Sequence, residues 1–145
     1  MWAHYANKHR GICLEFNAND ELFCQAIKIS YAEDYPIYDL TDETVNGNLM
    51  PLTSKSKAWE YEDEYRLIAQ VQDASNTENT LVACEDRVNL PENSLISVII
   101  GCLAPEGIEE DIRRITDQAS AAIEIKFAER SRDQYKISIT SEYSP

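Results

Sequence analysis

Hydrophobic and polar residues alternate in several short runs of this chain, and such runs are typical of β-strands. Strands are predicted at residues 12–16, 26–31, 65–72, 95–103, 123–127 and 135–140. Helices are predicted at residues 58–64 and, most clearly, after Pro105, where Ile108, Ile112 and Ile115 share one face. Residues 2–9 can form a further short helix, and Asp20 can cap another that runs through Gln25. The order of these elements predicts an α+β fold: a mixed, mostly antiparallel sheet of about five to six strands, with two to three helices.

Residues 32–53 are the longest segment without a regular pattern. They contain Pro36, Pro51, the turn-forming run Asn46-Gly47-Asn48 and many acidic residues, so neither a helix nor a strand is predicted there. Loops of this length inside a domain are often functional.

The length and charge of the chain limit what it can do. A chain of 145 residues fits a single domain spanning residues 1–145. Its net charge of −13 argues against direct binding to a nucleic-acid backbone, because such binding depends on cationic side chains. No apolar run of about 18 residues is present, so no membrane partner is expected. The four cysteines are widely spaced and read as free thiols, which favours a bacterial-type cytoplasmic location.

A search for known motifs excludes several classes of site. The chain has only four glycines, too few for a P-loop or a dinucleotide-binding turn. The acidic residues at the start of the helix after Pro105 read as helix capping rather than as a phosphate site. The spacing of His4, His9 and Cys13 matches no zinc pattern, so no metal site is predicted, and no cofactor is assigned.

A group of carboxylates before residue 67 is the strongest chemical signal. Glu60, Glu62, Asp63 and Glu64 are followed by Arg66. If the chain is extended from residue 62, then Glu62, Glu64 and Arg66 share one polar strand face, while Tyr61, Tyr65 and Leu67 pack inward. This face is either a solvated edge with weak ion pairs or a pocket in which a carboxylate acts as base and Arg66 orients it.

Two motifs together resemble the bacterial domain of unknown function 2971. They are Met1-Trp2-x-His4-Tyr5-Ala6-x-x-His9-x-Gly11-x-Cys13-x-x-Phe16 and Lys57-x-Trp59-x-Tyr61-Glu62-x-Glu64-x-Arg66-Leu67. Val98-Ile99-Ile100-Gly101 and Tyr135-x-Ile137 extend the likeness along most of the chain. The resemblance implies no established chemistry, but it favours a functional role for the polar residues of the two motifs.

The same resemblance bears on domain organisation. Family members usually carry a further segment before the first motif, so residues 1–145 are expected to be the C-terminal part of a longer family domain. A sheet that lacks its first strands exposes an edge, and exposed edges invite pairing between chains. We therefore expect a homodimer or an unstable monomer.

Two hypotheses for function remain open. The first is an enzyme acting on a nucleotide or NAD, because Glu62-x-Glu64 is similar to the glutamate motif of ADP-ribosyltransferases. In this hypothesis Glu64, Glu62 and Arg66 are catalytic, His4, Tyr5 and Trp59 bind the ligand, and the partner is a small-molecule nucleotide; a structural role for Trp59 is the alternative.

The second hypothesis is a non-enzymatic acidic module that recognises a protein or a cationic ligand. Tyr31, Tyr35 and Tyr38 lie among Glu33, Asp34 and Asp39, and aromatic rings beside carboxylates suit an amine or a basic peptide. The alternative is an ordinary polar loop whose tyrosines dip into the core.

Overall fold

The structure, a computed structural model, describes residues 1–37, 41, 45–71, 82–83 and 87–141. Its internal contacts divide the chain into two compact units. Unit 1 comprises residues 1–20 and 90–145, and unit 2 comprises residues 21–89. The expectation of one domain stays a prediction, and each unit is described by itself.

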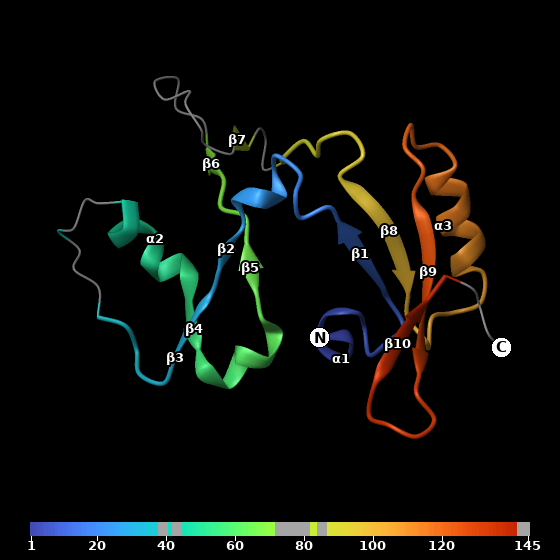
Figure 1. Cartoon of the computed structure of the whole chain (residues 1–145), viewed down its shortest axis with the longest axis horizontal. Helices are drawn as coiled ribbons and strands as arrows, with labels where there is room; N and C mark the ends of the chain where they lie inside the picture. The colour runs from blue at the N-terminus through green and yellow to red at the C-terminus, as the bar shows by residue number, and fades with distance from the viewer. Residues whose placement is uncertain (38–40, 42–44, 72–81, 84–86, 142–145) are drawn as a thin grey trace. The chain divides into compact units, whose positions relative to one another are not determined.

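Unit 1 contains a four-stranded mixed sheet in the order β1-β8-β9-β10 (Figure 1). Its elements are α1 (Trp2–Tyr5), β1 (Ile12–Phe16), β8 (Leu95–Ile100), α3 (Ile108–Thr116), β9 (Glu124–Arg130) and β10 (Ile137–Thr140). The pairs β1–β8 and β9–β10 are antiparallel, whereas β8 and β9 are parallel. Parallel neighbours need a crossover connection, and α3 forms it.

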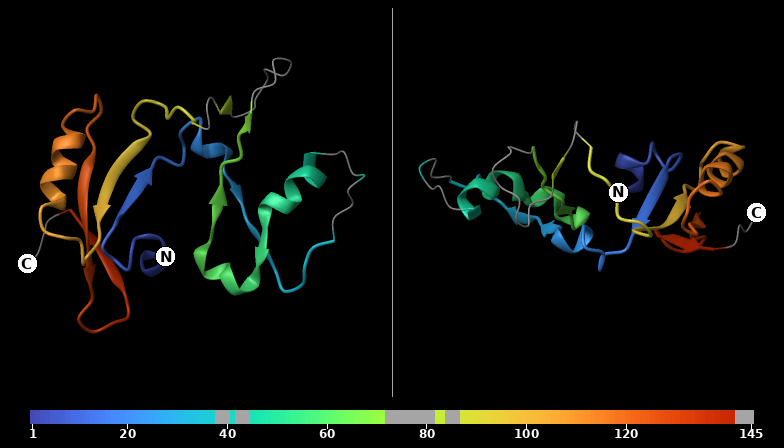
Figure 2. Two further views of the ribbon diagram at one scale, coloured as in Figure 1. Left: turned by 180° about the vertical axis from the view of Figure 1, so that it is seen from behind. Right: turned by 90° about the horizontal axis from the view of Figure 1, so that it is seen from above.

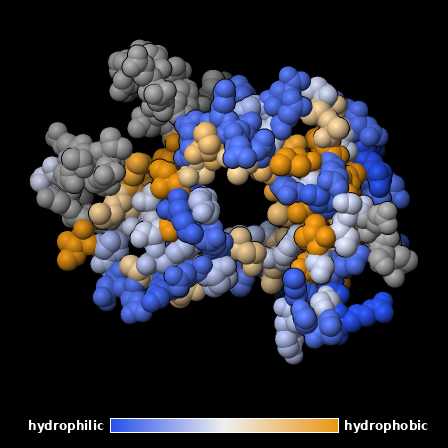
Figure 3. Space-filling model, viewed as in Figure 1, coloured by the Kyte–Doolittle hydropathy of each residue, from blue (hydrophilic) through white to orange (hydrophobic). Residues whose placement is uncertain are grey.

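The core of unit 1 lies between α3 and the two central strands. Ile112 of α3 packs with Val98 and Ile100 of β8 and with Phe127 of β9, and all four are buried. α3 lies against the half of the sheet that contains these strands (Figure 2). In the space-filling view, hydrophobic residues follow the strands and hydrophilic ones cover the outer side of α3 (Figure 3). The helical spacing after Pro105 thus correctly placed Ile112 in the core and Ile108 against it, whereas Ile115, expected on the same face, is largely exposed.

The N-terminal segment differs from its prediction. Helix α1 ends at Tyr5 instead of continuing to residue 9, because Asn7, Lys8 and His9 all have left-handed φ angles of 47°, 55° and 67°. Such conformations are unfavourable for residues other than glycine, by about 1–2 kcal/mol each. They turn the chain back, and the N–H of Gly11 then donates to the Ala6 carbonyl at 2.8 Å.

This turn docks on the end of β8 through backbone atoms. The N–H of Gly101 donates to the Gly11 carbonyl at 3.0 Å, and the N–H of Leu103 donates to the His9 carbonyl at 2.9 Å. A Cβ atom on Gly101 would lie 2.3 Å from the His9 carbonyl oxygen, which is far inside van der Waals contact. The glycine at position 101 is therefore explained by the close approach of two backbone segments.

The other face of the sheet carries a buried polar contact. Ser97 is fully buried, and its hydroxyl donates to the Glu15 carboxylate at 2.5 Å. Lys126 donates to the same oxygen at 2.6 Å. These bonds, first that from Lys126 and then that from Ser97, lower the pKa of Glu15. The serine in the middle of an apolar strand thus has a charged partner on the neighbouring strand.

Unit 2 consists of short elements and three two-stranded sheets, β2–β5, β3–β4 and β6–β7. Its elements are the 3₁₀-helices η1 (Phe23–Gln25) and η2 (Lys57–Glu62), the helix α2 (Val45–Thr53), and the strands β2 (Ile27–Lys28), β3 (Ser30–Ala32), β4 (Ser54–Ser56), β5 (Tyr65–Arg66), β6 (Gln70–Val71) and β7 (Val82–Ala83). The pair β2–β5 is antiparallel, and β3–β4 and β6–β7 are parallel.

The α+β class is confirmed, and the strands are distributed over one larger and three small sheets. The segment 32–53 differs from its prediction, because its second half forms α2 despite Pro51. The predicted strand 65–72 is interrupted, with β5 ending at Arg66 and β6 beginning at Gln70.

Two isoleucines of α3 test the assignment of the core. Ile112 is 7% exposed and Ile115 is 66% exposed on the same helix. We expect Ile112→Ala to lower the free energy of unfolding by about 2–4 kcal/mol, because it removes buried methyl groups and leaves a cavity. Ile115→Ala should change it by less than about 0.5 kcal/mol. Urea denaturation measures both, and equal losses would contradict the core described above.

Candidate functional site

Four charged side chains meet in unit 2, and we call them the ion-pair cluster: Lys55, Glu62, Glu64 and Arg66. Lys55 lies on β4, Glu62 ends η2, Glu64 precedes β5 and Arg66 lies within it. Strand β4 pairs with β3, which places Lys55 in register with Tyr31. Three separate elements therefore deliver the charges to one place.

Lys55 is the centre of the ion-pair cluster. Its ammonium donates to the carboxylates of Glu62 and Glu64, to the latter at 2.9 Å. The Glu62 side chain is only 2% exposed. The ammonium also lies 5.2 Å from the ring centroid of Trp59, within cation–π distance. Lys55 therefore neutralises the most deeply buried carboxylate of this region.

Glu64 is held from both sides. Arg66 donates to its two carboxylate oxygens, from Nε at 2.6 Å and from Nη2 at 3.2 Å. The backbone N–H of Glu64 donates to the Tyr31 hydroxyl at 2.9 Å, and its carbonyl accepts from the Ile29 N–H at 2.9 Å. The third Arg66 nitrogen, Nη1, donates to the Leu52 carbonyl at 2.6 Å. Both side chain and backbone of Glu64 are thus fixed.

Glu62, Glu64 and Arg66, predicted to share one strand face, do lie together in the ion-pair cluster. They do not do so on an extended strand. Asp63 has a left-handed φ of 44°, so the chain is not extended from Glu62 to Arg66. Glu62 lies inside, whereas Tyr61 and Tyr65 are each 56% exposed and do not pack inward. The reason is Lys55, which offers the two carboxylates a partner away from solvent.

The contacts of the ion-pair cluster determine its protonation. Hydrogen bonds from Arg66, and then from Lys55, lower the pKa of Glu64 to about 2. The bonds to Glu62 and Glu64 raise the pKa of Lys55, and Glu64 raises that of Arg66. At neutral pH Glu64 is thus a carboxylate and Lys55 an ammonium. Neither has the pKa near 7 that favours proton transfer, but Glu64 can accept hydrogen bonds or attract positive charge.

The remaining predicted site residues lie in different places. Trp59 is in η2 and contacts the ion-pair cluster through Lys55. His4 and Tyr5 are on α1 in unit 1, with their ring centroids 6.4 Å apart. A site shared by these two residues and Glu64 stays a prediction from the sequence.

Lys55 is a functional-site candidate that the sequence did not reveal. Lys55 stands in a short serine and lysine run, seven residues before Glu62, a spacing that brings no contact in a strand or regular helix. The contact arises instead because η2, which ends at Glu62, contacts β4. A lysine before a run of carboxylates was the available signal, and it is a weak one.

A small cavity lies beside the same pair of strands, β3 and β4. Its volume is about 350 Å³, and it is lined by residues 32–36 and 54–56. Tyr35 in its wall is 97% exposed. Of the tyrosine group singled out by sequence, Tyr31 contributes to the ion-pair cluster, while Tyr38 and Asp39 lie outside the described residues.

Within the residues that the structure describes, no group of three or more histidine, cysteine or acidic side chains is arranged to hold a metal ion. None of the helices that they form has the length and apolar character needed to cross a membrane.

Two lysines test whether the ion-pair cluster stabilises unit 2. Lys55→Met leaves the buried Glu62 carboxylate without its ammonium, and we expect the thermal unfolding midpoint to fall by on the order of 10 °C. Lys57 forms an exposed pair with Glu33 at 3.1 Å, so Lys57→Met should shift the midpoint by less than about 2 °C. Circular dichroism measures both midpoints. Similar shifts for the two variants would show that the ion-pair cluster stabilises unit 2 no more than an exposed ion pair does.

Comparison with known protein families gives a match to the part of the chain that contains the ion-pair cluster. Residues 1–67 match the profile of the family described as protein of unknown function (DUF2971). The match includes both motifs singled out by sequence and ends just after Arg66, so it does not extend to β8 or β10. No curated protein and no solved structure matches the chain significantly. The match supports assignment of the N-terminal segment, residues 1–67, to the DUF2971 family of proteins of unknown function.

Proposed function

We propose that this chain is a binding module for a cationic ligand, such as a lysine side chain of a basic peptide. The binding surface, which we call the Tyr35 surface, consists of Glu33, Asp34, Tyr35 and the facing strand β4 (Ser54–Ser56). The observation that carries the proposal is the cavity of about 350 Å³ there, with a tyrosine ring 97% exposed in its wall.

The charges around the Tyr35 surface favour a cation. Glu33 is engaged by Lys57 at 3.1 Å, and Lys55 is neutralised by the two glutamates of the ion-pair cluster. Asp34 makes no hydrogen bond or ion pair within the part of the chain that the structure describes. One carboxylate beside an exposed aromatic face therefore remains to meet a positive charge.

The rest of the chain supports the same ligand class. Unit 2 already places two lysine ammonium groups over aromatic rings, Lys55 over Trp59 at 5.2 Å and Lys28 over Tyr65 at 5.5 Å. The net charge of −13 adds long-range attraction for a positive ligand. Because Glu62 and Glu64 are neutralised by Lys55 and Arg66, binding by the Tyr35 surface is favoured over acid–base catalysis.

Alanine variants of Tyr35 and of Tyr135 test the Tyr35 surface. The probe is a trilysine peptide with both ends blocked, titrated by calorimetry at low salt. We expect Tyr35→Ala to weaken binding roughly two- to fivefold, as loss of an exposed cation–π contact does. Tyr135 is equally exposed but lies in unit 1, so Tyr135→Ala should leave the affinity unchanged.

The control ligand is the same peptide with its three lysines acetylated, which removes the charge and keeps the shape. The proposal is wrong if the acetylated peptide binds as well as the charged one. It is also wrong if both tyrosine variants bind like the unmodified chain.

Nucleotide or NAD binding near Glu64 is a second candidate, and one observation favours it. A carboxylate accepts about four hydrogen bonds. Glu64 receives three from Lys55 and Arg66, two of them on Oε2. Its Oε1 accepts one of these bonds and can accept a second, from a ribose hydroxyl. A pKa of about 2 keeps the Glu64 carboxylate charged.

Calorimetry with NAD tests this candidate. We expect Glu64→Gln to bind NAD about tenfold more weakly than the unmodified chain, since a hydrogen bond to a charged acceptor is lost. Glu60→Gln, an exposed change in the neighbouring η2, should have no effect. Absence of binding to the unmodified chain, or equal binding by both variants, would eliminate the nucleotide function.

Homodimer formation and a cytoplasmic location stay predictions from the sequence. The exposed edge strand β1 supports the first, because its Ile12 and Leu14 are 41% and 45% exposed.

A further inference from the structure

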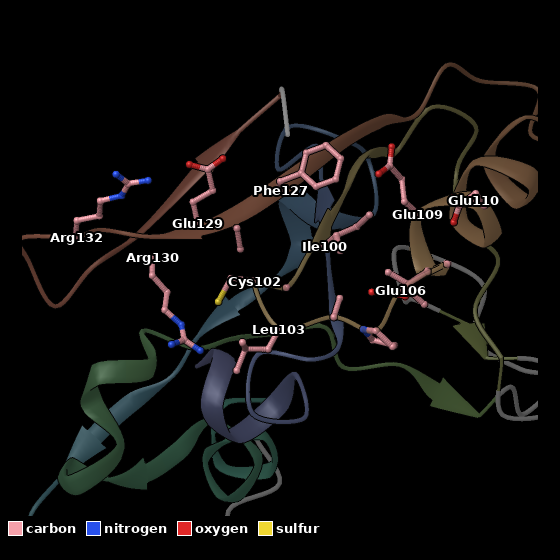
Figure 4. A pocket seen from close by; sticks show the side chains of 16 residues that line it. Ile100, Cys102, Leu103, Glu106, Glu109, Glu110, Phe127, Glu129, Arg130 and Arg132 are labelled. Atoms are coloured by element: carbon pink, nitrogen blue, oxygen red, sulfur yellow. The ribbon is translucent and has the colours of Figure 1, made fainter. Parts of the chain in front are cut away.

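The largest cavity of unit 1 lies where β8 ends and the chain turns into α3, and its volume is about 770 Å³ (Figure 4). Ile100 and Phe127 in its wall are buried core residues, so they are not available to a ligand. Arg130 and Arg132 point in different directions and do not converge on one place (Figure 4). The edge of the sheet at β1 is the better defined surface of unit 1.

Strand β1 forms one edge of the four-stranded sheet, and β10 forms the other (Figure 1). Within the described residues, β8 is the only strand that pairs with β1. Gly11, just before β1, lies opposite Gly101 and accepts its N–H at 3.0 Å. Because the direction of hydrogen bonding alternates along a strand, Ile12 and Leu14 direct their backbone N–H and C=O groups away from β8. This side of β1 can therefore receive another strand.

The side chains of β1 favour association at this edge. Ile12 and Leu14 share the sheet face of the core, since Leu14 lies opposite the buried Val98, yet they are 41% and 45% exposed. An unpaired, apolar edge is a template for pairing with another chain. Glu15, the charged residue of β1, is already paired with Lys126 at 2.6 Å. No unpaired charge of the strand itself therefore opposes pairing.

The two ends of β1 carry opposite charges. Lys8 and Arg10 precede the strand and are exposed, whereas Asp20 follows it. When two copies of a strand pair antiparallel about a two-fold axis, the start of each strand lies beside the end of the other. The basic end of one copy then meets the acidic end of its partner, twice in one dimer. The edge is thus complementary in charge to a second copy of itself.

We propose that two copies of this chain associate through β1, which pairs antiparallel with its counterpart and joins the two sheets into one. The proposal rests on the homodimer expected above and specifies its interface. Pairing along the whole of Ile12–Phe16 places the middle residue, Leu14, on the two-fold axis. Each Leu14 then lies opposite its counterpart, and each Ile12 lies opposite the partner's Phe16.

Cysteine substitutions test this register. Opposite residues in a hydrogen-bonded antiparallel pair have Cα atoms about 5.5 Å apart, a distance that a disulfide spans. The two Ile12 residues of the dimer are separated by about four strand positions, or roughly 13 Å, which is too far for a disulfide. In a chain that also carries Cys13→Ser, we expect Leu14→Cys to give a disulfide-linked dimer on mild oxidation with diamide.

Ile12→Cys in the same Cys13→Ser chain is the matched control, because Ile12 and Leu14 are almost equally exposed. It should be linked about tenfold more slowly than Leu14→Cys, or not at all. Non-reducing electrophoresis measures both rates, and peptide mass spectrometry identifies the linked residue.

Lysine substitutions test which edge of the sheet is used. Leu14→Lys places two like charges directly opposite each other in the dimer, and lysine on an edge strand blocks pairing. We expect it to weaken dimerisation about tenfold in sedimentation velocity at about 0.15 M salt, where long-range repulsion between the two acidic copies is screened. Ile139→Lys should leave dimerisation unchanged, because Ile139 is 43% exposed on the opposite edge strand, β10. Circular dichroism checks that each variant keeps the fold.

The outcomes separate the interface from the homodimer itself. A chain that stays monomeric up to about 1 mM overturns both. A dimer that Leu14→Lys does not weaken, or that Ile139→Lys weakens equally, overturns the assignment to β1 and leaves the homodimer in place. Linkage of Ile12→Cys as fast as that of Leu14→Cys overturns the assignment in the same way.

Discussion

Unit 1 depends on the pairing of β1 with β8, two strands that lie roughly 80 positions apart in sequence. Backbone hydrogen bonds secure the pair at both ends. Gly11 and His9 bind Gly101 and Leu103 at one end, and the N–H of Asn17 donates to the Ser94 carbonyl at 2.8 Å at the other. The bonds of Gly101 and Leu103 fix where β8 ends, and hence where the connection from β8 to α3 begins. The bond between Asn17 and Ser94 holds together the two points of unit 1 between which unit 2, residues 21–89, is inserted.

The sequence predicted those parts of the fold that local patterns determine. Strand β1 has the predicted bounds, and the apolar side chain of Ile112 lies in the core, because alternation and helical spacing directly reflect burial. Helix α1 is shorter than predicted because the backbone of His9 bonds to residues after β8, a contact that no local pattern encodes. Helix α2 was missed because Pro51 and Gly47 are unfavourable in helices.

The candidate site shows the same division. Glu62, Glu64 and Arg66 were recognisable because they are close in sequence, and they do belong to one cluster. Lys55 joins them because η2 contacts β4, the strand that carries Lys55, and its ammonium is the partner of the buried Glu62. The family match ends at residue 67, so it contains the whole ion-pair cluster but not the strand that β1 requires. The charged residues of the candidate site and the three strands that complete the sheet of unit 1 thus lie in different parts of the sequence.

The insertion of unit 2 between β1 and β8 has a consequence for biosynthesis. Ribosomes add about 5–20 residues per second, so β1 waits roughly 4–16 s for its partner. Unit 2 is continuous from residue 21 to residue 89 and has all of its own strands before β8 is made. During that interval Ile12 and Leu14 have no sheet to join. Translation order therefore allows unit 2 to fold first, and the sheet of unit 1 is completed only after β8 and the strands that follow it have been made.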